Sequence, residues 1–304
     1  FKRDNDAVIA RRTAQDIGIA IIGQSKEVDP ADKKLYALRD VTGTIESIPL
    51  IASSIMSKKL ACGTDAILLD VKFGSGAFMK TLDDARTLAR AMVEIGDSLG
   101  RDTRAILTDM DEPLGLAVGN SLEVKEAIAT LQGHGPKDVV ELALGAGAIL
   151  LQQAKIAPDV EEGKRLIRKA IDDGSGLRKL VALFKAQGGD ETYITDPGKF
   201  PLARYVIPVE SRKEGYVRRI DSLTIGVSAM KLGAGRETMD DLIDMSAGII
   251  LNKKVGDRVG EGEVLCYLHT NKEGIMDIAK EVQDAFEISD ELVEKKPMIQ
   301  DYIH

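Results

Sequence analysis

The chain has 304 residues, 44% of them hydrophobic, enough to bury the core of one large domain or two ordinary ones. No apolar run is long enough to span a bilayer, so we expect no membrane association. The formal net charge is −8, and basic residues alternate with acidic ones without a basic cluster that contains aromatic residues. We therefore expect no nucleic acid as a partner.

The first sixty residues predict mostly helical structure. Phe1 to Ile17 form the first expected helix, and residues 19–22 form a short buried strand. A further helix is expected to start at Asp29-Pro30, with proline at its first position. Residues 29–61 then predict a small helical lobe inserted into an α/β domain that starts with residues 1–28.

Residues 62–200 continue the predicted α/β domain. The apolar run 66–69 is consistent with a strand buried on both faces, and a glycine loop follows it. Thr81 to Asp84 predict a capped helix start, residues 105–107 a second strand and residues 121–131 another helix. Repeated strand, loop and helix indicate a parallel sheet. Residues 136–186 are expected to be helical.

Residues 201–304 predict a C-terminal α+β part. Strand-like alternation occurs in residues 205–209 and 215–220, and residues 256–265 form a turn-rich β segment. The expected fold class is thus α/β, with a parallel or mixed sheet flanked by helices. Cys62 and Cys266 stand far apart, and we expect two buried, reduced thiols in a cytoplasmic protein.

One segment concentrates chemistry that suits a small planar ligand. Ser54 and Lys58 are four residues apart, so they share one helix face, and Arg39 lies on the expected helix before them. A guanidinium, a hydroxyl and an ammonium group suit carbonyl oxygens that gain negative charge during a reaction. For any single Arg or Lys, a solvated helix charge is the commoner interpretation.

Other motifs are weaker. The glycines of Gly74-Ser75-Gly76 could cradle phosphate, although the third glycine of a dinucleotide fingerprint is absent. Asp70 and Lys72 follow a strand and either bind a ligand or form a local salt bridge. Lys231 is similar to the acceptor lysine of a biotinyl carrier, but the glycine turns follow it instead of preceding it. A surface lysine is the better interpretation.

The segment from Tyr36 to Leu60 closely resembles the pyrimidine-binding signature of the pyrimidine nucleoside phosphorylase and thymidine phosphorylase family. The resemblance extends over nearly the whole chain. The matching segments occur in the family's order: 19–24, 29–33, 70–78, 107–110, 117–127 and 233–236. The family's helical start and its Lys-His-Ser-Thr-Gly-Gly phosphate loop do not occur in these 304 residues. No phosphate-binding residue is therefore assigned, and we expect these residues alone to be inactive.

The resemblance implies a pentosyltransferase of nucleoside salvage. A pyrimidine nucleoside and inorganic phosphate would give free base and pentose 1-phosphate, without an organic cofactor. Arg39, Lys58 and Ser54 would act on the base, and Tyr36, Ile55 and Phe78 would shape its pocket. The other interpretation of Phe78 is an ordinary core residue. The resemblance also implies a homodimer formed through the helical lobe.

The resemblance further implies a structural monovalent cation, potassium, held by Leu114, Ala117 and Glu126. Two carbonyl oxygens and one carboxylate are hard ligands that suit such an ion. An isolated glutamate on a helix would otherwise be read as solvated.

Three alternative functions remain open from the sequence. One is a phosphorylase restricted to thymidine, and another is a phosphoribosyltransferase of similar fold, which would need a diphosphate loop that we do not find. The third, of a different class, is a non-catalytic binding module, because part of the reaction's machinery is missing from these residues.

Overall fold

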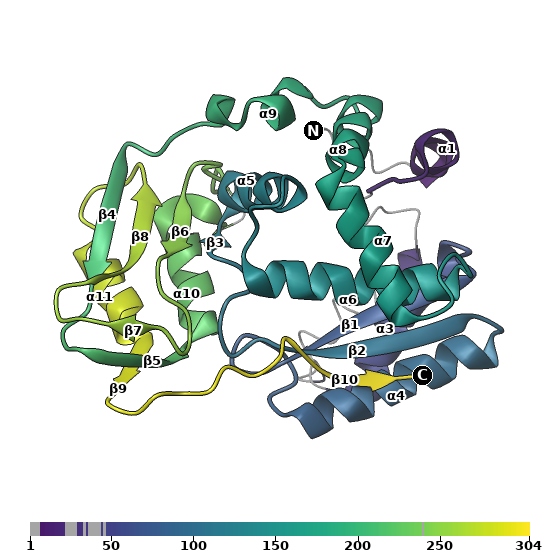
Figure 1. Ribbon diagram of the computed structural model, residues 1–304, viewed down its shortest axis with the longest axis horizontal. Coiled ribbons are helices and arrows are strands. Elements are labelled where there is room, and N and C mark those ends of the chain that lie inside the picture. The colour runs from purple at the N-terminus through teal and green to yellow at the C-terminus, as the bar shows by residue number, and fades with distance from the viewer. Residues whose placement is uncertain (1–6, 22–28, 33–34, 36–43, 45–46, 239) are drawn as a thin grey trace.

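The computed structural model describes residues 7–21, 29–32, 35, 44, 47–238 and 240–304. They form two parts that lie side by side (Figure 1). Among the described residues, one part is built on a three-stranded sheet flanked by helices, and the other on a four-stranded and a three-stranded sheet. The predicted α/β class, with helices flanking the sheets, is confirmed.

The first sheet contains strands β1 (Ala66–Phe73), β2 (Asp102–Asp109) and β10 (Ile299–Ile303), in the order β1-β2-β10. β1 and β2 are parallel, whereas β10 runs antiparallel to β2, so the sheet is mixed. The end of the chain thus returns to the first part (Figure 1). The sequence predicts one C-terminal part at residues 201–304 and does not indicate this return.

Helix α4 (Leu82–Ser98) connects β1 to β2, because parallel neighbours require a crossover. It starts at the predicted cap, where the Thr81 hydroxyl accepts the Asp84 N–H at 3.1 Å. Arg86 of α4 donates from Nε to Oδ2 of Asp301 at 2.6 Å, so an ion pair attaches β10 to this helix.

The core of the first part lies between β1, α4 and helix α3 (Ile48–Ala61). Ile48, Ile51 and Ile55 pack against this core, and Met56 is buried in it. α3 is thus attached to the α/β part. Ser47 occupies the N-cap position but makes no capping hydrogen bond through its side chain.

Burial alternates along β1. Ile67, Leu69, Val71 and Phe73 are buried, whereas Ala66 and Leu68 are only half-buried. The prediction of a strand fully buried on both faces is therefore wrong for residues 66–69. One face of β1 packs against α3 and α4 and is buried, while helix α6 (Lys137–Gln153) partly covers the other face.

The predicted helical stretch after residue 136 is confirmed. Its helices α6, α7 and α8 follow helix α5, and all four lie above the first sheet in Figure 1. Their remaining bounds are α5 (Asn120–Leu131), α7 (Val160–Asp172) and α8 (Ser175–Ala186). A short helix, α9 (Thr192–Thr195), and a 3-10 turn (Pro197–Lys199) lead to the second part.

Within the described residues, the second part contains one sheet in the order β3-β6-β8-β4 and another in the order β7-β5-β9. β3 follows β2 in the chain but pairs with β6, so the loop after β2 passes from one part to the other. The bounds are β3 (Ala117–Val118), β4 (Tyr205–Glu210), β5 (Gly215–Ile220), β6 (Gly248–Leu251), β7 (Arg258–Val259), β8 (Val264–Thr270) and β9 (Phe286–Ser289).

Helices α10 (Ser222–Ala229) and α11 (Met276–Asp284) cover these two sheets, and α10 continues into a π-helical turn (Met230–Ala234). The core here is a separate apolar cluster to which both sheets and α10 contribute. It includes Val217, Ile220, Ile225, Leu232, Ile249, Leu268 and Val282. The predicted α+β character of this part is confirmed.

The start of the chain differs from expectation. Helix α1 is described from Ala7 to Ile17, and the first six residues of the expected helix lie outside the described residues. Residues 19–21 do not form a strand, because Ile21 exchanges both backbone hydrogen bonds with the side-chain amide of Gln187, at 3.0 and 2.6 Å. Ile22 lies outside the described residues. The helix expected at Pro30 is present in residues 30–32.

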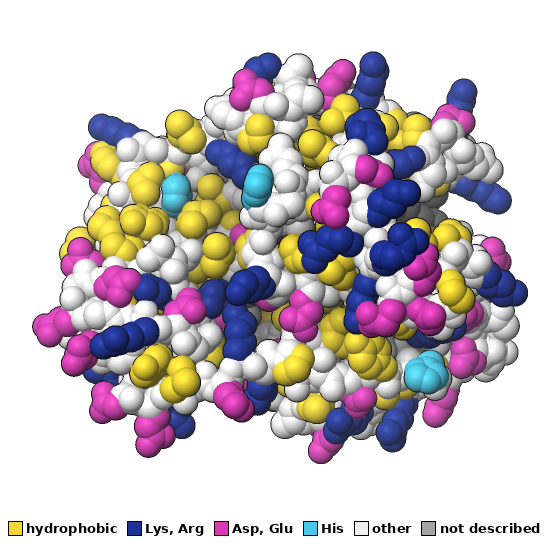
Figure 2. Space-filling model, viewed as in Figure 1, with side chains coloured by type: hydrophobic (Ala, Val, Ile, Leu, Met, Phe, Trp, Pro, Cys, Tyr) yellow, Lys and Arg dark blue, Asp and Glu magenta, His cyan; other side chains and the backbone are white. Residues whose placement is uncertain are grey.

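The surface carries both signs of charge. On the face in Figure 2, Lys and Arg side chains are interspersed with Asp and Glu side chains. In the part of the chain that the structure describes, no helix has the length and apolar character that crossing a membrane requires. Cys62 is exposed, contrary to the prediction of two buried thiols, because α3 ends in a surface turn at this residue; Cys266 is buried.

Candidate functional site

Ser54 and Lys58 lie together on α3. The ammonium Nζ of Lys58 donates to the Ser54 hydroxyl at 3.4 Å, as their spacing of four residues predicts. Ser54 is 9% exposed. The oxygen of its hydroxyl group accepts this hydrogen bond from Lys58, so the O–H remains able to donate a hydrogen bond to a ligand.

Asp32 fixes this pair from outside the helix. Its Oδ2 lies 2.9 Å from Nζ of Lys58, and its side chain is only 7% exposed, against 31% for Lys58. A buried carboxylate requires a partner cation, so the ion pair sets the direction of the ammonium group. Sequence reasoning missed Asp32 as a functional residue, although it belongs to the matching segment Asp29–Lys33.

The other predicted base-pocket residues divide into two groups. Arg39 and Tyr36 lie outside the described residues. Ile55 packs against the core between α3 and α4. Phe78 is 70% exposed, so it is not the ordinary core phenylalanine that was the alternative interpretation.

The glycine loop at residues 74–78 is not an open phosphate cradle. The Ser75 N–H donates to Oδ1 of Asp111 at 2.9 Å, and the Gly76 N–H donates to the Met110 carbonyl at 3.1 Å. The Gly74 N–H donates to the Met79 carbonyl at 3.0 Å, and the Ala77 N–H donates to the Gly74 carbonyl at 3.1 Å. These contacts bind the loop to the segment after β2 instead of leaving donors for phosphate.

Glycine is required in this loop for space. Gly74 has φ +116°, and a Cβ there would lie 2.7 Å from Oδ1 of Asp111. A Cβ on Gly76 would lie 2.7 Å from Cβ of Ser222, at the start of α10. The loop that carries Phe78 is therefore in contact with both parts of the molecule.

Asp70 and Lys72 form the local salt bridge that was one of their two interpretations. Nζ of Lys72 lies 2.6 Å from Oδ2 of Asp70, and it also donates to the Thr108 hydroxyl at 3.0 Å. Thr108 in turn donates to Oδ1 of Asp70 at 2.5 Å. The three side chains thus form hydrogen bonds with one another across β1 and β2, near the ends of the strands.

Glu126 holds the loop that contains Leu114 and Ala117. Its Oε1 accepts the N–H groups of Leu116 at 2.8 Å and Ala117 at 3.0 Å. Burial raises the pKa of Glu126, opposed by these two hydrogen bonds. The three predicted cation ligands thus belong to one small region.

The region around Glu126 is crowded. Gly115 has φ +69°, and a Cβ there would lie 2.1 Å from Oε2 of Glu126. Among the described residues, no group of three or more His, Cys, Asp or Glu side chains is arranged to hold a metal ion. The predicted site relies on carbonyl oxygens, so it stays a prediction.

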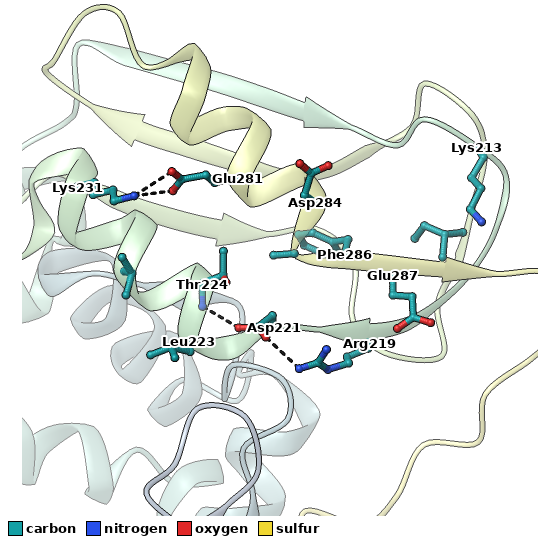
Figure 3. Close-up of a pocket in the computed structure, with 13 residues that line it drawn as sticks. Lys213, Arg219, Asp221, Leu223, Thr224, Lys231, Glu281, Asp284, Phe286 and Glu287 are labelled. Atoms are coloured by element: carbon teal, nitrogen blue, oxygen red, sulfur yellow. Dashed lines mark hydrogen bonds and ion pairs between the residues drawn. The ribbon is translucent and has the colours of Figure 1, made fainter. Parts of the chain in front are cut away.

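An open groove of about 910 Å³ lies elsewhere, between α10, α11 and β9 (Figure 3). Its charged residues are largely paired: Arg219 lies 3.0 Å from Asp221, and Lys231 lies 2.7 Å from Glu281. None of the predicted site residues lines this groove. Lys231 is a surface lysine in an ion pair, as expected.

Comparison with known proteins places these features in a family. A model of the glycosyl transferase family, a/b domain, matches residues 4–177. The chain belongs to this family. A model of the pyrimidine nucleoside phosphorylase C-terminal domain matches residues 216–289, so the resemblance that the sequence motifs indicated is confirmed.

The chain is also similar to curated relatives named pyrimidine-nucleoside phosphorylase. Those from Staphylococcus aureus strains bovine RF122 / ET3-1, USA300 and NCTC 8325 are each 54% identical over 275 residues. The matched region covers 90% of this chain and 64% of each relative. The chain therefore spans less than two thirds of the length of these relatives.

Proposed function

We propose that the protein is a pyrimidine nucleoside phosphorylase acting on uridine and thymidine. The observation that carries the proposal is the Ser54–Lys58 pair on α3, oriented by the buried carboxylate of Asp32. It lies within the segment that resembles the family's base-binding signature. The relatives' name supports the same substrate class.

In this reaction an oxygen of inorganic phosphate bonds to the anomeric carbon while the bond from that carbon to the base nitrogen breaks. The bonding electron pair leaves with the base, which becomes anionic until it takes up a proton. Phosphate is the nucleophile, so neither a protein nucleophile nor an organic cofactor is required.

Lys58 and Arg39 stabilise the negative charge on the base oxygens. This charge develops only as the bond breaks, so the two cations lower the energy of the transition state more than that of the bound substrate. Ser54 donates a hydrogen bond to N3 or an adjacent oxygen. Tyr36, Ile55 and Phe78 shape the pocket.

Three finer assignments complete the proposal. A potassium ion binds at Leu114, Ala117 and Glu126, supported by the position of Glu126 against the loop of the other two. The protein forms a homodimer through the helical segment at residues 29–61. It acts in the cytoplasm, where its two cysteines stay as free thiols, as they are here.

Alanine substitutions on α3 test the base site in the full-length protein. Lys58→Ala should reduce kcat on uridine and thymidine about a hundredfold or more, the usual effect of removing one preorganised donor. Arg39→Lys should also lose activity, because an ammonium cannot reproduce a planar fork.

Lys59→Ala is the matched control for Lys58, since Lys59 is the next residue of the same helix and is exposed. Ser53→Ala serves in the same way for Ser54→Ala, because Ser53 is exposed and, among the contacts described, its hydroxyl donates to the Leu50 carbonyl of its own helix. Equal activity of Lys58→Ala and Lys59→Ala would refute the assignment. Comparing the two nucleosides separates a broad enzyme from a thymidine-restricted one.

A further inference from the structure

Lys254 is a buried lysine that the proposed reaction does not use. It lies between β6 and β7 in the second part, and it is only 7% exposed. Its Nζ donates to the carbonyl oxygens of Pro113 and Gly115, the latter at 3.0 Å, and to Oδ2 of Asp138 at 3.0 Å. All three donors of the ammonium group therefore have an acceptor in the first part or in the loop leading from it.

The surroundings of Nζ have the composition of a site for a monovalent cation. Two backbone carbonyls and the Asp138 carboxylate contact it directly, and Oε2 of Glu112 lies 3.6 Å away. Hard, partly anionic oxygens of this kind bind alkali ions. Here the cation is covalently attached to the second part.

The acceptors are themselves fixed by other contacts. Asp138 accepts the Gly115 N–H at 3.0 Å and its neighbour Val139's N–H at 2.9 Å. Glu112 accepts the Val255 N–H at 2.9 Å, next to Lys254 in the chain. Residues 112–115 are thus held from both sides by groups that converge on one ammonium.

This network continues to the glycine loop. Asp111, adjacent to Glu112, accepts the Ser75 N–H, and Met110 accepts that of Gly76. The loop of residues 74–78 carries the exposed Phe78. A displacement of residues 112–115 would therefore move the acceptors that hold the Phe78 loop.

We propose that Lys254 is a positioning residue whose ammonium fills a monovalent-cation site formed by Pro113, Gly115 and Asp138. In doing so it fixes the loop between the two parts and, through Asp111, the loop that carries Phe78. The structural role stands independently of the proposed function, whereas the effect on nucleoside binding rests on it.

Chemical rescue tests the site directly. Lys254→Ala in the full-length protein leaves the oxygen ligands and an empty space for a small cation. We expect its melting temperature to fall by roughly 5–10 °C, because removing one member of a buried ion pair leaves a buried charge. Ammonium or potassium chloride at about 100 mM should restore part of this loss, and tetramethylammonium chloride should not.

Two control variants sharpen the result. Lys254→Met should respond to ammonium no more than the wild type does, because the methionine side chain occupies the space. Lys253→Ala removes a neighbouring lysine whose Nζ contacts only Arg258 and Glu263 of the second part among the contacts described. Its stability should show no more response to ammonium than that of the wild type. An equal effect of ammonium and tetramethylammonium on Lys254→Ala would overturn the proposal.

Kinetics supply a readout that a purely structural role would not give. In the proposed pocket Phe78 packs beside the base and carries no charge or donor for the oxygens that become anionic, so its displacement should weaken substrate and transition state about equally. Lys254→Ala should raise KM for uridine about tenfold and change kcat less than threefold, and ammonium should lower KM again. Loss of kcat at unchanged KM would contradict the positioning role.

A second variant covers the case in which Lys254→Ala does not fold. Asp138→Asn keeps Lys254 but removes the negative charge that its ammonium group contacts, so the loop is held less firmly. This variant should raise KM for uridine in the same way. Unchanged KM in Asp138→Asn would then refute the proposal. If the wild type shows no phosphorolysis, the proposed function fails, while the ammonium effect on melting still tests the site.

Discussion

The ammonium of Lys58 lies 2.9 Å from Oδ2 of Asp32, a carboxylate that is almost completely buried. The two residues come from different helical segments, so the ion pair joins the start of the predicted lobe to α3. It gives Lys58 a fixed direction next to Ser54. The candidate site therefore depends on a residue that makes no proposed contact with the substrate.

Asp32→Asn should reduce kcat/KM for uridine about ten- to a hundredfold. The neutral amide no longer holds the ammonium group, and misplacement of a catalytic group by about 1 Å has effects of this size. Steady-state kinetics measure the change. Asp65→Asn is the control, because Asp65 is fully exposed and pairs with Arg101 only at 3.4 Å. Similar kinetics for the two variants would contradict the role of Asp32.

Glu126→Ala should make phosphorolysis less sensitive to the choice of cation while leaving the base pocket intact. The motivating observation is that Glu126 holds the loop that contains the other two predicted potassium ligands. Activity and melting temperature are compared in potassium, sodium and tetramethylammonium buffers. If the unmodified protein responds equally to all three buffers, the potassium assignment fails.

Gly115→Ala should destabilise the protein by about 3 kcal/mol or more. The substitution combines a left-handed backbone conformation with a Cβ placed 2.1 Å from Oε2 of Glu126. Gly133→Ala provides the comparison, since Gly133 has φ +86° but its Cβ would meet nothing within 4 Å. It should lose only about 1 kcal/mol. Urea unfolding of both variants separates the contact with Glu126 from the backbone effect.

The two thiols should differ strongly in reactivity. Burial raises the pKa of Cys266 to about 12, so almost no thiolate forms at neutral pH, whereas Cys62 is exposed. A chromogenic disulfide reagent should label one thiol in the native protein and two after unfolding. Cys62→Ser should remove the native reaction. Labelling of Cys266 at the same rate as Cys62 would contradict the buried environment.

Stability should decrease as pH falls below about 6.5, the usual pKa of histidine. Burial, with a smaller contribution from Lys125, lowers the pKa of His269 in the folded protein. The unfolded chain therefore binds the proton at higher pH, which favours unfolding until the pH reaches the folded pKa.

His269→Gln should flatten this dependence, measured as urea midpoints between about pH 5 and 8. His134→Gln should retain it, because His134 is exposed. A slope that is equal in His269→Gln and the wild type would assign the pH dependence to other groups.

The sequence predicted local features well where they depend on near neighbours in the chain. The Thr81 cap, the helices after residue 136 and the face shared by Ser54 and Lys58 follow from spacing, because residues three or four apart meet on a helix. The resemblance of residues 36–60 indicated the family before any contact was known. Arg39 and Tyr36 remain predictions from that resemblance.

Only the tertiary structure decided which distant residues meet. β10 pairs with β2, which lies nearly 200 residues earlier in the chain. The side chain of Gln187 forms the hydrogen bonds with Ile21 that a neighbouring strand would have formed, and Asp32 orients Lys58. The environment of Lys254 was also decided only by the tertiary structure. In the sequence it is one lysine in a turn, whereas in the folded protein its ammonium group lies among the carbonyl oxygens of the loop after β2. Spacing along the chain carries no information about such contacts, because they form when separate apolar faces pack and bring polar groups together.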